Sequence, residues 1–192
     1  MDIDGNFYPS IIINGQEWIQ QNLVVTRYRN GDPIPTGGSN AAWQNFSGSG
    51  LAIYNNDAAN NALYGKLYNW YAVNDSRGLC PTGWHVPSDA EWTTLENNLG
   101  GSGGAGGKMK STTGWTSPNT GATNESAFTG LPGGYRLVNG TYGGIGNNGN
   151  WWSSTESGSN VAWYRTLGYV NSLVGRNYGS KLYGFSVRCV RD

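Results

Sequence analysis

The chain has 192 residues, enough to bury a substantial core in a single domain spanning residues 1–192. Twelve basic side chains balance twelve acidic ones, which excludes the strongly basic surface typical of nucleic-acid-binding proteins. No stretch is apolar enough for membrane insertion, and residues 1–4 lack the basic start and apolar run of a signal peptide. We therefore expect either a mature chain or a protein exported without a leader.

The composition indicates a surface module. Only 12% of the residues are charged, whereas aromatic residues make up 13% and there are 31 glycines. Tyrosine and tryptophan offer large contact areas at little entropic cost. Residues 136–192 carry six basic and two acidic side chains, against six and ten in residues 1–135. This basic bias favours acidic glycans or an acidic protein patch as partners, unless it is only a solvated face.

The first third of the chain predicts β-hairpins and loops. Asn14-Gly15 follows three isoleucines and suits a type I′ turn, in which both central residues need positive φ. Asp4-Gly5 is a second candidate turn. Residues 36–50 are rich in Gly, Ser and Asn, and they predict either a loop held by aromatic side chains or a short helix over 40–45.

Two helices are predicted in the middle of the chain. The first runs from Asp57, a candidate N-cap, to Tyr71, with apolar side chains at helical spacing. The second starts at a capping box in which Ser88 and Glu91 exchange hydrogen bonds, and it ends at Gly100-Gly101. Residues 100–107 are almost all Gly and Ser, and they predict a flexible loop.

The last third predicts short strands that form a recognition face. In Phe185–Val190, odd and even positions should point to opposite sides, as in a half-buried strand. The segment between the strands mixes aromatic, amide and cationic side chains with glycine, a composition suited to adaptable binding. We expect eight of these residues to contact a ligand: Tyr164, Tyr169, Asn171, Arg176, Asn177, Tyr178, Lys181 and Tyr183.

The two cysteines, Cys80 and Cys189, leave two alternatives open. A disulfide between them would close a loop of about a hundred residues and could contribute about 4–5 kcal/mol through loop entropy. Two free buried thiols are the other alternative, because spacing alone does not decide the pairing.

Catalytic chemistry has little support in the sequence. His85 is the only histidine, so any Ser-His-Asp or Cys-His mechanism would depend on it. No cluster of His, Cys and carboxylate residues has the spacing of a zinc site. We expect no enzymatic activity, no catalytic residue and no cofactor.

Four stretches resemble one protein family. They are Asp2–Tyr8 with Gln20–Leu23; Cys80–Trp92; Gly107–Lys110 with Ser117–Ser126; and Trp151–Glu156 with Gly184–Asp192. In this order they resemble the Fibrobacter succinogenes major paralogous domain, which is abundant in surface and secreted proteins of Bacteroidetes, Fibrobacteres and their phages.

The resemblance implies an α+β, C-type-lectin-like fold related to the formylglycine-generating enzymes. Two helices would pack on twisted antiparallel sheets joined by long Gly/Asn-rich loops, and the first and last strands could pair. By analogy with many C-type lectins, Cys80–Cys189 would tie the second helix to the last strand. Oxidase activity is not implied, because the two closely spaced late cysteines of those enzymes are absent.

A structural calcium ion is an alternative that the resemblance leaves open. Asn55–Asp57 and the loop from Asn119 to Glu125 offer oxygen ligands. The Glu-Pro-Asn and Gln-Pro-Asp triplets of calcium-dependent sugar-binding lectins are absent, so calcium-mediated sugar binding is not expected.

These observations favour a non-catalytic, extracellular or cell-surface binding module for a carbohydrate or a surface protein. A sharper variant is a protein whose late segment is diversified by a retroelement. The alternative from another class is self-assembly, in which the chain is a structural subunit of an extracellular fibre, sheath or adhesin and an edge strand joins a neighbour's sheet.

Overall fold

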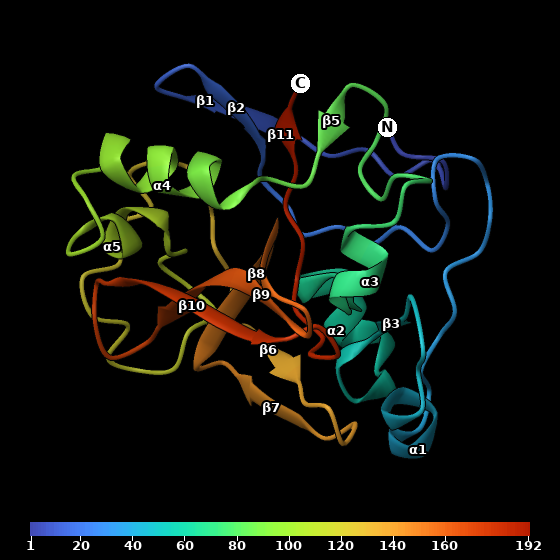
Figure 1. Ribbon diagram of the computed structural model, residues 1–192. Coiled ribbons are helices and arrows are strands. Elements are labelled where there is room, and N and C mark those ends of the chain that lie inside the picture. The colour runs from blue at the N-terminus through green and yellow to red at the C-terminus, as the bar shows by residue number, and fades with distance from the viewer.

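The computed structural model describes residues 1–192 and shows an α+β architecture (Figure 1). The strands are β1 Ser10–Ile13, β2 Gln16–Ile19, β3 Leu51–Ala52, β4 Leu67–Tyr68, β5 Trp84–His85, β6 Gly133–Arg136, β7 Tyr142–Ile145, β8 Asn148–Gly158, β9 Val161–Gly168, β10 Val174–Ser180 and β11 Val190–Arg191. The helices are α1 Asn40–Gln44, α2 Ala58–Tyr64, α3 Trp70–Val73, α4 Asp89–Asn98 and α5 Ala105–Met109, with a 3-10 turn, η1, at Tyr54–Asn56. No helix has both the length and the apolar character needed to cross a membrane.

A small sheet brings the two ends of the chain together. Its strand order is β1-β2-β11-β5, so the last strand lies between an early hairpin and the strand before α4 (Figure 1). The β1–β2 turn is the predicted one, because Asn14 and Gly15 have φ of 45° and 90°. The expected pairing of early and late strands is confirmed by Val190, which pairs with Trp18.

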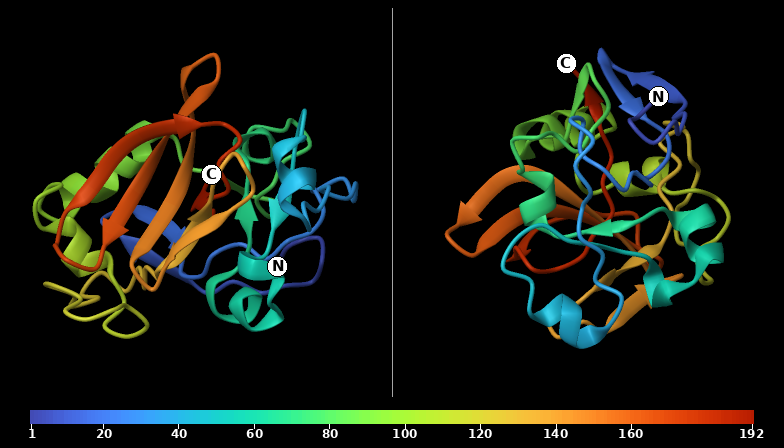
Figure 2. Two further views of the ribbon diagram at one scale, coloured as in Figure 1. Left: turned by 90° about the horizontal axis from the view of Figure 1, so that it is seen from below. Right: turned by 90° about the vertical axis from the view of Figure 1, so that its right-hand side faces the viewer.

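The larger sheet has the order β10-β9-β8-β6-β7 and carries the late segment. It is mixed rather than purely antiparallel, because β6 pairs with β8 in parallel through Gly134 and Gly149. The left view of Figure 2 shows its strands fanning out by twist, with α4 behind them. The other face of this sheet is turned toward the viewer.

Helix α4 has the start predicted from its sequence. The Ser88 hydroxyl accepts from the Glu91 backbone, and the Glu91 carboxylate accepts from the Ser88 N–H. Trp92 and Leu95 are fully buried where α4 packs on β8 and β9. Capping and burial therefore cooperate to fix this helix on one face of the large sheet.

The prediction of one helix from Asp57 to Tyr71 was wrong. Asp57 does cap α2, but Gly65 leaves the helical conformation at φ 76°, and β4 separates α2 from α3. A Cβ at Gly65 would stand 2.8 Å from the Leu23 carbonyl oxygen. The tight backbone contact with residues 22–23 therefore ends the helix, which periodicity could not show.

The Gly/Ser segment 100–107 is also more ordered than predicted, because α5 begins within it. A Cβ at Gly106 would lie 2.4 Å from the Leu173 carbonyl oxygen, and one at Gly107 would lie 2.3 Å from the Gly121 carbonyl oxygen. The glycines allow backbone to pack against backbone here, so they serve close approach rather than flexibility.

The last strand was predicted as half-buried over Phe185–Val190, but β11 covers only Val190–Arg191, and both sides of the segment 185–190 are buried. Phe185, Val187 and Cys189 join one core cluster, whereas Val190 joins the other. Between them, the fully buried Arg188 donates to the carbonyls of Ile19, Phe128 and Thr129. The alternation is real, but the segment runs between two cores instead of along a surface.

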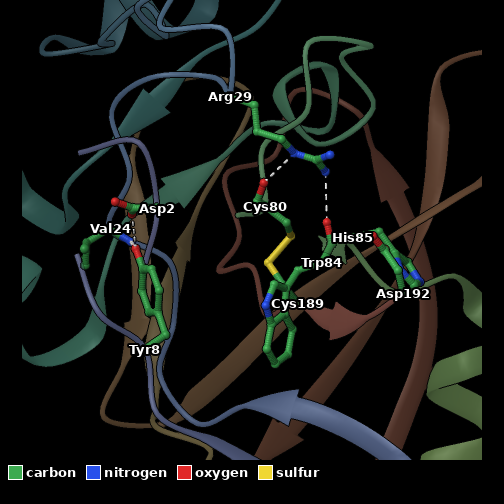
Figure 3. Close-up of a disulfide and its surroundings, with 9 residues drawn as sticks. All are labelled: Asp2, Tyr8, Val24, Arg29, Cys80, Trp84, His85, Cys189 and Asp192. Atoms are coloured by element: carbon green, nitrogen blue, oxygen red, sulfur yellow. Dashed lines mark hydrogen bonds and ion pairs between the residues drawn. A yellow bond between two sulfur atoms is a disulfide. The ribbon is translucent and has the colours of Figure 1, made fainter. Parts of the chain in front are cut away.

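Cys80 and Cys189 form the disulfide, with their Cα atoms 6.1 Å apart (Figure 3). The bond ties the segment before α4 to the segment before β11, as the family resemblance implied. Arg29 reinforces this corner by donating to the carbonyls of Cys80 and Trp84. Both sulfur-bearing residues are buried in the larger core cluster.

Candidate functional site

The eight predicted contact residues do not share one surface. In the β9–β10 register, Tyr164 lies opposite Asn177, whereas Trp163 lies opposite Tyr178 and Arg165 opposite Arg176. Paired residues in adjacent strands point to the same side, and neighbours along a strand point to opposite sides. Tyr164 and Asn177 therefore lie on one face of the sheet, and Arg176 and Tyr178 lie on the other.

Helix α4 packs on part of the face with Arg176 and leaves Tyr178 exposed. Arg176 Nη2 lies 2.8 Å from Asp89 Oδ2, and the buried Arg165 bridges Asp89 and Glu96. Burial opposes ionisation of Asp89, but the two guanidinium groups outweigh it and hold its pKa below the ordinary value. The Arg176 guanidinium also stacks 3.6 Å from the centre of the Trp163 ring. Arg176 thus joins β10 to α4 through Asp89, and its side chain stays 46% exposed on this face.

Three further predicted residues have local roles. Lys181 is buried, and its Nζ lies 2.7 Å from Glu156 Oε1 and donates to the Ser159 carbonyl. The Asn171 side chain accepts from the Leu173 backbone within the β9–β10 loop. Tyr169 lies in the same loop, where its backbone pairs with residues 120 and 147.

The remaining face contains a hollow of about 360 Å³, here called the tyrosine hollow. Tyr164 and Tyr183 are predicted residues that line it, and Asn177 lies on the same sheet face. Its lining also includes residues that the sequence reasoning did not select. The full lining is Tyr135, Leu137, Asn148, Asn150, Tyr164, Thr166, Tyr183 and Phe185.

Strand alternation could have found part of this set. Asn150 pairs with Thr166 across β8 and β9. Asn150 lies two residues before Trp152, and Thr166 lies two residues after Tyr164, which is the partner of Trp152. These positions therefore share the face of Tyr164. Tyr135 comes from β6, whose place beside β8 depends on the parallel pairing that the sequence did not reveal.

Glycines leave room for the rings of the hollow. A Cβ at Gly179 would lie 2.8 Å from the Tyr183 ring, and a Cβ at Gly143 would lie 2.9 Å from the Tyr135 ring. Tyr164 packs edge-on against Trp152 and at 4.5 Å, centre to centre, against Phe185. The aromatic side chains are therefore seated on the sheet and on the core, which preorganises the hollow.

The tyrosine hollow is uncharged and polar. No Asp, Glu, Lys or Arg lines it. Burial raises the pKa of Tyr164, and the neighbouring Tyr183 and Tyr135 phenols raise it further. The three phenol groups line the same hollow. They can donate and accept hydrogen bonds, as can the nearby amides and the Thr166 hydroxyl.

His85 has a structural environment. Its Nε2 lies 2.8 Å from Glu91 Oε1 and its Nδ1 lies 2.7 Å from Asp192 Oδ1, so both ring nitrogens are engaged. Burial opposes the charged form, but hydrogen bonds to Asp192 and Glu91 outweigh it and raise the pKa of His85. The imidazole thus links the capping box of α4 to the last strand.

A lysine holds one of the two loops that offered calcium ligands. Lys110 is fully buried, and its Nζ donates to the carbonyls of Thr120, Gly168 and Asn171 at 2.8, 3.1 and 2.8 Å. Its ammonium group thus gathers carbonyl oxygens from two loops, as a bound cation would. No group of three or more His, Cys, Asp and Glu side chains is placed to hold a metal ion.

Motif residues from distant stretches meet in a buried polar network. The Asn22 side-chain oxygen accepts from Trp151 Nε1 at 2.9 Å and from Arg188 Nε at 2.8 Å. Its amide donates to the Tyr64 carbonyl and to the Ser186 hydroxyl. Asn22, Trp151, Ser186 and Arg188 belong to the first and the last of the four stretches that carry the family resemblance, and their contacts here hold those stretches together.

Comparison of the chain with known protein families agrees with the resemblance seen in the sequence. The family model described as the Fibrobacter succinogenes major domain matches residues 11–191. No curated protein matches the chain.

Proposed function

The chain belongs to the Fibrobacter succinogenes major domain family, and from that premise we propose that it is a non-catalytic recognition module. Its binding site is the tyrosine hollow, and its ligand is a carbohydrate or a surface protein. The observation that carries the proposal is an open hollow lined by three neighbouring phenols, amides and apolar side chains on a rigid sheet. Concave sites with apolar walls and a few convergent polar groups are the usual form of binding sites.

The proposed fold is C-type-lectin-like. Three features support it: the early and late strands pair in one sheet, α4 packs on the larger sheet, and the disulfide connects the approach to α4 with the last strand. The disulfide also supports an extracellular or cell-surface location, because such bonds persist in oxidising compartments.

In the sharper form of the proposal, a retroelement diversifies the late segment while the framework stays fixed. The late segment contains both open-face residues and buried framework residues, which supports this form. Tyr164, Asn177 and Tyr183 lie on the open face, whereas Arg165 and Lys181 are buried framework residues. A near-copy of this DNA segment beside a reverse transcriptase gene, differing only at adenines, would be the matching genomic observation.

The test is a screen of the purified chain on arrays of glycans and bacterial surface proteins. Thr166→Trp would fill the hollow without removing a core ring, and Tyr178→Ala would remove an exposed ring from the opposite face. We expect Thr166→Trp to abolish binding and Tyr178→Ala to retain it, with both variants showing wild-type far-ultraviolet circular dichroism and cooperative unfolding in urea. Binding that survives Thr166→Trp would refute the assignment of the site.

Self-assembly as a structural subunit is the second candidate function. Strand β1 is an outer strand of its sheet, and Ile12 and Phe7 beside it are 68% and 75% exposed. Exposed edge strands can pair with the same strand of a second copy. Light scattering would detect such assemblies, and Ile12→Lys should disperse them, whereas a monomer at every concentration would exclude this function.

A further inference from the structure

We infer that the ligand of the tyrosine hollow is an uncharged glycan, bound through its hydroxyl groups and ring faces without a metal ion. This inference rests on the proposed recognition function and specifies its ligand class. It concerns the eight lining residues already named, together with the neighbouring Asn177.

The charge distribution around the hollow disfavours an anionic ligand. The cationic side chains near this face of the sheet already have carbonyl or carboxylate partners within the protein. Arg136 is fully buried and donates to the carbonyls of Gly37, Ser39 and Gly140. Lys181 is paired with Glu156. A sialic acid, uronic acid or sulfated sugar would therefore lose its hydration without gaining a cationic partner, which is costly. The basic bias of the last third thus serves the framework instead of an acidic ligand.

The hydrogen-bonding groups of the hollow match a polyhydroxylated ligand. The phenols of Tyr135, Tyr164 and Tyr183 and the hydroxyl of Thr166 can each donate and accept. A sugar hydroxyl has the same double capacity, so several such groups can be paired at once. Asn148 adds a side-chain amide at the rim, and the tyrosine rings supply flat apolar surface for the C–H face of a pyranose ring.

The position of the hollow argues against an extended peptide strand. Peptides that join a sheet use the unpaired N–H and C=O groups of an edge strand. The hollow instead lies over β8 and β9, where Asn150 and Thr166 are partners within the paired ladder. The backbone groups beneath the ligand are already satisfied, so recognition must come from side chains. The volume of about 360 Å³ is at the small end of ligand sites, which suits a short glycan segment.

Metal-independent binding follows from the same lining. Calcium in proteins is bound by roughly six to eight oxygen atoms, usually including at least one carboxylate. The hollow offers neutral amide and hydroxyl oxygens and no carboxylate. A chelator should therefore leave the affinity unchanged.

The decisive experiment compares neutral, sialylated, uronic and sulfated glycans on one array, followed by calorimetry of the best neutral hit with and without EDTA. We expect binding to neutral glycans only, with equal affinity in EDTA. Tyr164→Phe and Tyr183→Phe keep the rings and remove one hydroxyl each, and each should weaken binding by about three- to tenfold, the range of one lost hydrogen bond. Tyr178→Phe is the matched control on the opposite face and should bind as the wild type does.

The failures of the two proposals are distinguishable. Preference for acidic glycans, or loss of binding in EDTA, would overturn the inference while leaving the hollow as the site. Binding to surface proteins alone, blocked by Thr166→Trp, would also overturn the glycan class and keep the recognition function. Binding of any ligand that Thr166→Trp does not block would overturn both.

Discussion

Removal of the disulfide should destabilise the protein by an amount that the chain topology sets. Cys80 and Cys189 are 109 residues apart, so the bond restricts more than half of the unfolded chain. The loop-entropy relation for a loop of this length gives about 4.8 kcal/mol at 25 °C. In a protein of this size, about 1 kcal/mol corresponds to about 2–4 °C in Tm, so Cys80→Ala/Cys189→Ala should lower Tm by about 10–20 °C.

Urea unfolding followed by tryptophan fluorescence measures the effect. The free energy of unfolding should fall by about 4.8 kcal/mol, and the m-value should rise because the uncrosslinked unfolded chain exposes more surface. Wild-type protein reduced with dithiothreitol is the control and should behave as the double variant does. A loss below about 1 kcal/mol with an unchanged m-value would refute the view that the bond acts on the unfolded chain.

Three further perturbations test separate contacts. His85 has a raised pKa between Glu91 and Asp192, so its contribution to stability is complete below about pH 6.5 and is lost as the pH rises through the raised pKa. The Tm of the wild type should therefore fall over this pH range relative to the Tm of His85→Gln. Parallel Tm profiles of the two proteins would contradict the ion pairs. Lys110→Met would leave three buried carbonyls unpaired and should lower the free energy of unfolding in urea by about 3 kcal/mol. An unchanged free energy of unfolding would show that the loops rearrange. Gly106→Ala would push a Cβ into the Leu173 carbonyl and should cost about 1–3 kcal/mol in the same assay, and an unchanged midpoint would mean that the backbone yields.

The sequence alone determined the features whose cause is local. The capping box of α4 needs only Ser88 and Glu91 three residues apart, because their side chains satisfy backbone groups within one turn. The β1–β2 turn needs only Asn14-Gly15, because these residues tolerate positive φ. The family resemblance likewise depended on short motifs, whose residues prove to be structural in the buried network around Asn22.

Tertiary structure decided which side chains form the tyrosine hollow. A shift of one residue in strand pairing moves every side chain to the other face, so the β9–β10 register decides that Tyr164 lies in the hollow and Tyr178 does not. Tyr135 enters only because β6 lies parallel to β8, a contact between distant segments. Composition marked the late segment as rich in binding groups, but Lys181 is buried against Glu156 and Arg176 forms an ion pair with Asp89 on the opposite face of the sheet. Long-range pairing carries no local signature, which is why the face of each residue could be known only from the folded chain.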